Sequence, residues 1–93
     1  MAEEPKAQRE IDFTTFCVSL ASSAFVHLGD MPHPESQQTE PNLVLAKQTI
    51  DLLGMLQAKT RGNLTDEEAK LLEHLLADLR LRYVARSTGG APG

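Results

Sequence analysis

The sequence contains little that would support covalent or metal chemistry. Its 93 residues include a single cysteine, Cys17, so an intramolecular disulfide and a multi-cysteine metal site are both excluded. There is no phosphate-binding loop, dinucleotide fingerprint, Cys-x-x-Cys pair or zinc-protease motif. We therefore expect a protein that is not an enzyme, with no catalytic residues and no cofactor. Tryptophan is absent and aromatic residues make up only 4% of the chain, so leucine and alanine must build most of the core.

The chain also lacks the positive charge typical of nucleic-acid-binding proteins. Thirteen acidic residues against nine lysines and arginines give a formal net charge of −4. Non-specific nucleic-acid binding depends mainly on neutralising phosphates, so this balance disfavours it, and it disfavours docking on anionic membranes for the same reason. Three arginines near the end of a predicted helix, Arg80, Arg82 and Arg86, keep weak nucleic-acid binding open as an alternative hypothesis.

The longest uncharged run, residues 13–29, fits neither an export signal nor a membrane span. The charged residues before it are mainly acidic, which is the wrong sign for a signal peptide. Six of its first sixteen residues are Thr, Ser or His, which is too polar for a span. The single cysteine fits a reducing compartment. We therefore predict a soluble cytoplasmic protein.

Three segments carry the helical spacing of apolar residues, and none shows the alternation typical of a strand. They predict one all-α domain over residues 11–86, between a flexible segment at 1–10 and a flexible tail at 87–93. The expected fold is a three-helix bundle consisting of a helix, a long loop and an antiparallel helical hairpin. A chain this short buries a limited fraction of its surface, which favours association with a second copy.

The first helix is expected from about Asp12 to Leu28. Asp12 is suited to cap it, and Ile11 just before the cap would pack against Phe16. Gly29 supplies a left-handed stop. Small residues along this helix would allow another helix to approach closely. The predicted apolar face consists of Phe13, Phe16, Cys17, Leu20, Ala21, Ala24, Phe25 and Leu28.

Residues 30–40 contain two prolines and no apolar periodicity, which predicts a loop long enough to cross from one end of a bundle to the other, or from one subunit toward another. The second helix is expected from about Pro41, because proline suits a first helical turn, to Lys59. Val44 and Met55 fall outside its main stripe, so this helix should be covered on more than one side. The main stripe consists of Leu43, Ala46, Ile50, Leu53 and Leu56, widened by Leu45 and Leu52.

The third helix is expected from Asp66 to about Arg86. Thr65 and Glu68 have the spacing of a capping box, and the acids at 66–68 suit the positive end of the helix dipole. Gly62 is placed to end the second helix, and the short link implies an antiparallel hairpin. The predicted buried face consists of Leu72, Leu75, Leu76, Leu79 and Tyr83.

Two residue pairs were weighed as chemical sites. Ser23 and His27 lie four residues apart on one face, but no orienting acid or oxyanion site accompanies them, so they predict a half-buried histidine. His74 and Asp78 are the candidate metal ligands, in a site that a dimer would complete by symmetry. Lys70 beside them would repel a cation, so no metal site is expected there.

Two of the three helices have apolar faces wider than a three-helix monomer needs, which predicts a symmetric homodimer. The leading hypothesis is a non-enzymatic adaptor or regulator that acts as a homo-oligomer, with a further protein partner left open. The alternatives are a small-ligand or metal-binding bundle using His27 or His74, and the weak nucleic-acid binder. The interaction residues we predict are Phe13, Cys17, Ala21, Ala24, Leu52 and Met55.

The segments VSLASSAFVHLGDMPHP and NLVLAKQTIDLLGMLQAKTRGNLTDEEAKLLEHLLADLRLRYV resemble the bacterial domain of unknown function 1844 family over roughly residues 13–84. The most specific part joins IDLLGML to KTRGNLTDEE and on to LRLRYV. Family members usually carry a Thr-Gly-Glu-like turn in the first loop, where this chain has ESQQTE. The resemblance implies a small cytoplasmic bacterial helical protein. It implies no activity, so no functional residues are carried over from it.

Overall fold

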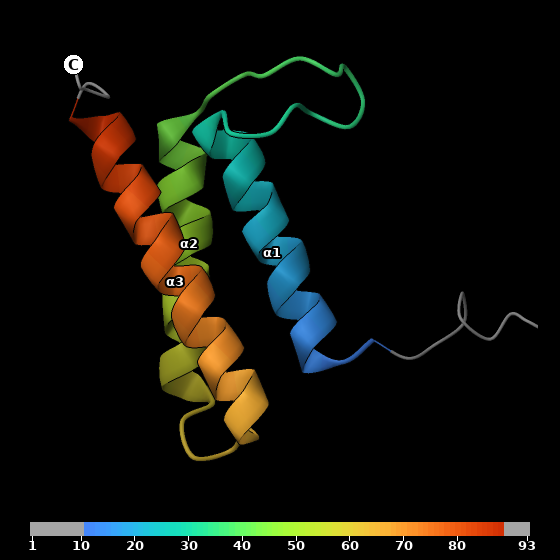
Figure 1. Cartoon of the computed structure of the whole chain (residues 1–93), viewed down its shortest axis with the longest axis vertical. Helices are drawn as coiled ribbons and strands as arrows, with labels where there is room; N and C mark the ends of the chain where they lie inside the picture. The colour runs from blue at the N-terminus through green and yellow to red at the C-terminus, as the bar shows by residue number, and fades with distance from the viewer. Residues whose placement is uncertain (1–10, 89–93) are drawn as a thin grey trace, which may run out of the picture.

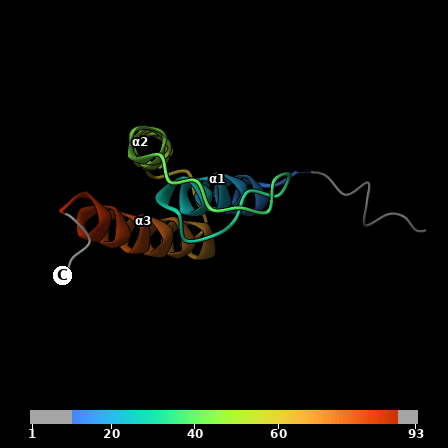
Figure 2. The ribbon, with the colours of Figure 1, turned by 90° about the horizontal axis from the view of Figure 1, so that it is seen from above.

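The computed structural model describes residues 11–88, and these form three helices with no strand among them. α1 spans Phe13–Leu28, α2 spans Leu43–Lys59 and α3 spans Asp66–Ser87. Consecutive helices run antiparallel, so α1 and α3 point the same way (Figure 1). Each helix contacts both of the others; seen from above, α2 appears end-on while α1 and α3 are inclined to it (Figure 2). The prediction of an all-α three-helix arrangement is confirmed.

Local polar groups set the two ends of α1. The Thr15 amide donates to Asp12 Oδ1 at 2.8 Å, which satisfies one of the free amides of the first turn. Gly29 ends the helix with a φ of 88°, in the left-handed region. The expected packing of Ile11 on Phe16 buries little, because these side chains are 79% and 43% exposed.

α2 ends at Lys59 as predicted, but it begins later than predicted and a different residue caps its C-terminal end. The helix begins at Leu43, two residues after Pro41, because Asn42 Oδ1 accepts a hydrogen bond from the Leu45 amide at 3.1 Å. Thr60, and not Gly62, ends it: the Thr60 amide and hydroxyl both donate to the Leu56 carbonyl, at 2.9 and 2.6 Å. Gly62 instead provides a left-handed residue within the turn, at φ 84°.

The loop between α1 and α2 does not cross the bundle, which corrects the sequence prediction. It leaves and returns at the same end of the molecule (Figure 1). The Asn42 amide donates to the His27 carbonyl at 2.7 Å, so the two ends of the loop lie side by side. Within the loop, the Gln37 amide donates to the His33 carbonyl at 2.7 Å. The loop residues beyond those needed for a tight connection therefore form a loop that closes on itself at the end of α1.

The predicted capping box of α3 is present. The Glu68 amide donates to Thr65 Oγ1 at 3.1 Å, and the Thr65 amide donates to Glu68 Oε1 at 2.9 Å. The helix continues to Ser87 and is capped by Thr88, so these two residues do not belong to a tail as predicted. The segments 1–10 and 89–93, predicted to be flexible, lie outside the described residues.

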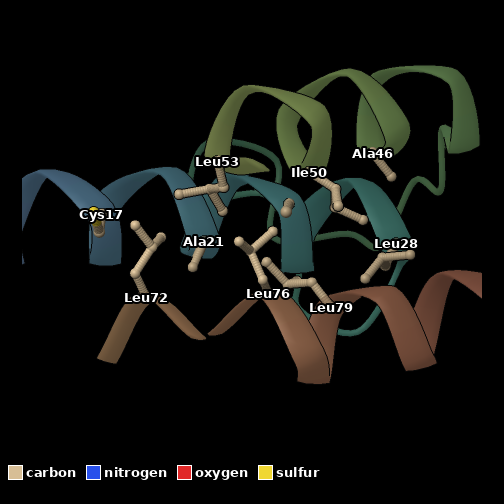
Figure 3. Packing of buried hydrophobic residues seen from close by; sticks show 10 residues of the cluster. Cys17, Ala21, Leu28, Ala46, Ile50, Leu53, Leu72, Leu76 and Leu79 are labelled. Carbon is tan, nitrogen blue, oxygen red and sulfur yellow. The ribbon is translucent and has the colours of Figure 1, made fainter. Parts of the chain in front are cut away.

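Leucines of α3 fill the space between α1 and α2. Leu72, Leu76 and Leu79 point from α3 toward the other two helices, and each is at most 1% exposed (Figure 3). Alanines on α1 and α2 allow the helix backbones to approach closely around these leucines. The core is therefore built mainly from leucine and alanine, as the composition predicts. Its buried members are Cys17, Ala21, Ala24, Leu28, Ala46, Ile50, Leu53, Leu72, Leu76 and Leu79.

Candidate functional site: an apolar face on the second helix

The structure divides the predicted interaction residues into two groups. Cys17, Ala21 and Ala24 are no more than 2% exposed and belong to the core, so their place in the predicted interaction surface is wrong. Their small side chains do permit close helix packing, but the helices that cover them are α2 and α3 of the same chain. Phe13 is half-buried against this core. Leu52 and Met55 remain at the surface, 45% and 49% exposed.

Leu52 and Met55 belong to a larger apolar surface on the side of α2 that faces away from the core. Four of the ten exposed large hydrophobic side chains in residues 11–88 lie there, at spacings that place them on one broad side of a helix. Gln48 and Asp51 lie beside Leu52 and Met55 and line a shallow groove with them. We call this surface the outer α2 face; its apolar members are Val44, Leu45, Leu52 and Met55.

Sequence reasoning missed Val44 and Leu45 as members of this surface. Leu45 was predicted to widen the buried stripe of α2, but Thr49 occupies that edge and is 9% exposed. The Thr49 hydroxyl donates to the Leu45 carbonyl at 2.9 Å, so its burial leaves no hydroxyl unsatisfied. The signal for Val44 was present in the sequence, because Val44 and Met55 are eleven residues apart and therefore share a helix side.

The arginines near the end of α3 are mostly committed to contacts within the chain. Arg82 Nη1 and Arg86 Nη2 bind Asp30 at 3.0 and 2.6 Å. Arg82 also donates through Nε to Asp78 at 2.9 Å, and its guanidinium lies 5.1 Å from the centroid of the Phe25 ring. These arginines therefore tie α3 to the end of α1, which reduces the basic surface left for nucleic acid.

Asp30 makes the stability of this contact depend on pH. Burial raises the pKa of the Asp30 carboxyl, but hydrogen bonds from Arg86 and Arg82 outweigh burial and hold the net pKa below its ordinary value of 3.8. A carboxyl whose pKa is lower in the folded state stabilises the fold above its unfolded pKa. That stabilisation is lost as the pH falls through the folded pKa.

We expect Asp30→Asn to lower the free energy of unfolding at pH 7 by about 1 kcal/mol, because hydrogen bonds to charged groups are lost although the arginines are partly solvated. The difference from the wild type should shrink as the pH falls below the ordinary carboxyl value of 3.8, since the carboxyl of the unfolded chain is protonated there and that of the folded chain follows at lower pH. Urea denaturation of both proteins at pH 7 and at a pH below 3.8 measures the difference in the free energy of unfolding. An equal difference at both would contradict a charged role for Asp30.

The histidines lie in two different environments. His27 is half-buried, and its ring centroid lies 6.4 Å from that of His33 in an edge-on arrangement. No hydrogen bond joins Ser23 to His27 in the described part of the chain, although both line one groove between α1 and the loop. His74 is exposed on α3, and its candidate partner Asp78 is bound to Arg82. Among residues 11–88, no cluster of three or more His, Cys, Asp or Glu side chains could hold a metal ion.

Cys17 is enclosed by the core and is fully buried. Burial, and to a smaller extent the charge of Glu68, raise the pKa of the Cys17 thiol above its usual value. A buried thiol with a raised pKa is a poor nucleophile, because the thiolate is the reactive form. None of the helices in residues 11–88 combines the length and the apolar character needed to cross a bilayer.

Together these features define a small all-α protein of three helices, with four of the ten exposed large hydrophobic side chains in residues 11–88 gathered on the outer α2 face. A family model described as Domain of unknown function (DUF1844) matches residues 10–85. The chain therefore belongs to the DUF1844 family, which confirms the resemblance inferred from its sequence. Neither the curated proteins nor the solved structures gave a significant match.

Proposed function

We propose that this protein is a non-enzymatic interaction protein of the bacterial cytoplasm that acts as a homo-oligomer, as an adaptor or regulator of a larger assembly. In this proposal the outer α2 face docks against the same face of a second copy. The observation that carries the proposal is the gathering of Val44, Leu45, Leu52 and Met55, 40–69% exposed, on one helix. Contiguous apolar surface of this kind marks interaction sites in small proteins.

The energetics favour a dimer of modest affinity. Removing the exposed part of each of these side chains from water is worth roughly 1 kcal/mol, which is about half of the value for a fully buried Leu or Met. Four side chains from each copy then contribute on the order of 8 kcal/mol, within the range of the translational and rotational cost of association. We therefore expect assembly that depends on protein concentration.

The double variant Leu52→Gln/Met55→Gln tests the proposal. Glutamine is a good helix former, so the substitutions remove apolar surface while preserving α2. We expect sedimentation velocity at micromolar concentration to show a dimer for the wild type and a monomer for the double variant. Circular dichroism should show the same helix content and nearly the same melting temperature at low concentration.

Leu81→Gln is the matched control for this experiment. Leu81 is 71% exposed but lies on α3, outside the outer α2 face, so this variant should dimerise like the wild type. A wild type that stays monomeric throughout the micromolar range would overturn the proposed function. A double variant that dimerises as tightly as the wild type would show that the outer α2 face is not the interface.

A further inference from the structure

The outer α2 face has nearly the same pattern of residue types in both directions. Val44 and Leu45 form its apolar N-terminal part, and Leu52 and Met55 form its apolar C-terminal part. Between them lie one basic and one acidic residue, Lys47 and Asp51. The midpoints of the pairs Val44–Met55, Leu45–Leu52 and Lys47–Asp51 all fall between residues 48 and 50.

We infer that two copies pair antiparallel along α2, about a two-fold axis beside Gln48, with Lys47 of each copy facing Asp51 of the other. This inference rests on the proposed function, since it specifies the partner and the geometry of the same surface. A two-fold axis at this position places Val44 and Leu45 of one copy against Met55 and Leu52 of the other. Such an interface is isologous, as expected for a closed dimer.

The charges distinguish the antiparallel pairing from a parallel one. Lys47 Nζ lies 2.8 Å from Asp51 Oδ2 within one helix, and these side chains are 59% and 63% exposed. Both are therefore accessible to a second helix, and Asp51 already lines the groove of the outer α2 face. Antiparallel pairing alternates the four charges along the edge of the interface. A parallel two-fold pairing would place the Lys47–Asp51 edges of the two copies on opposite sides of the interface, so these charges would not meet across it.

The ends of α2 follow the same charge pattern. Lys59, the last residue of the helix, is in helical register with Leu52 and Met55 and therefore lies on the outer side. In the antiparallel dimer its amine approaches the segment before the partner helix, where the acidic residue Glu40 offsets the unfavourable positive end of that helix dipole. Antiparallel alignment also opposes the two helix dipoles favourably.

Complementary charge variants test the proposed contact. Lys47→Glu makes this edge of the face wholly acidic, and Asp51→Lys makes it wholly basic. Each variant alone should dimerise about tenfold more weakly than the wild type, because two attractive pairs become repulsive. An equimolar mixture should form heterodimers with about the wild-type affinity. The pairing within each helix stays broken in both variants, so recovery on mixing reports a contact between copies.

Native mass spectrometry and sedimentation velocity of the separate and mixed variants provide the readout. Lys70→Glu, the same charge change at an exposed position of α3, should leave homodimerisation unchanged. If the wild type dimerises through the outer α2 face but the mixture forms only the statistical share of heterodimers, the antiparallel pairing is overturned while the proposed function stands. A monomeric wild type would overturn both.

Cysteine cross-linking tests the position of the axis by a second route. The two Gln48 positions lie beside the axis, so Gln48→Cys should form a disulfide-linked dimer under mild oxidation. Met55 lies about six residues from the axis, so its two copies are separated by roughly 18 Å along the helices and Met55→Cys should not link to itself. Native Cys17 is fully buried and does not compete. Equal cross-linking at both positions would indicate parallel pairing and overturn the inference.

Discussion

Gly29→Ala is expected to lower the free energy of unfolding by about 3 kcal/mol, through two separate effects. Gly29 has a φ of +88°, a conformation that is strained for any residue with a Cβ atom. A Cβ built at this position would also lie 2.8 Å from Pro41 Cγ and 3.3 Å from Pro41 Cβ. The proline ring is stiff and precedes Asn42, whose amide is bonded to the His27 carbonyl, so it has little freedom to move aside.

Gly62→Ala is the matched control for this prediction. Gly62 has nearly the same φ, +84°, but nothing lies within 4 Å of its Cβ position. It should therefore show the backbone strain alone, about 1 kcal/mol. Urea denaturation of the two variants under one condition separates the effects. Equal losses at the two glycines would show that contact with Pro41 does not constrain the junction between α1 and α2.

Leu76→Ala is expected to cost about 3 kcal/mol, the typical value for removing a fully buried leucine side chain. Leu76 is 1% exposed and projects from the middle of α3 into the space between α1 and α2 (Figure 3). Alanine would leave a cavity there, because the packed helices around it relax only partly into the space. Since small domains are stable by only about 5–15 kcal/mol in total, this variant should unfold at a markedly lower urea concentration.

Leu81→Ala provides the comparison on the same helix. Leu81 is 71% exposed, so the same chemical change should alter the free energy of unfolding by less than about 0.5 kcal/mol. Helix propensity changes equally in the two variants and cancels from the comparison. A similar loss at both positions would mean that Leu76 is not packed as the structure shows. The measurement belongs at low protein concentration, so that it reports the unfolding of a single chain.

The use of small residues on α1 also explains why the outer α2 face is left free. Cys17, Ala21 and Ala24 allow α2 and α3 to approach α1 closely, so the buried sides of these helices are narrow. The core needs only Ala46, Ile50 and Leu53 as fully buried apolar residues from α2. Apolar residues beyond this set remain at the surface. The outer α2 face is therefore a consequence of how compactly the three helices pack.

Interactions close in sequence were the most predictable part of the fold. The cap at Asp12, the left-handed Gly29 and the capping box of Thr65 and Glu68 each involve groups within a few residues of one another. Their geometry follows from local chemistry, so the residue types and their spacing are enough to predict these helix ends. The prediction of a helix end was wrong where two neighbouring residues could each begin the helix. At the start of α2 the side chain of Asn42 provided a better cap than the turn implied by Pro41.

By itself the sequence determined the number of helices, most of their ends, the leucine and alanine core and the family, because these depend on periodicity, capping and composition. Only the tertiary structure decided which apolar side of each helix the chain itself covers. Apolar periodicity identifies the side of a helix that avoids water, but it does not say what covers that side. For this reason the sequence predicted both Cys17 and Met55 to be interaction residues. The answer depends on helix contacts between residues far apart in the chain, which bury Cys17 completely and leave Met55 half-exposed.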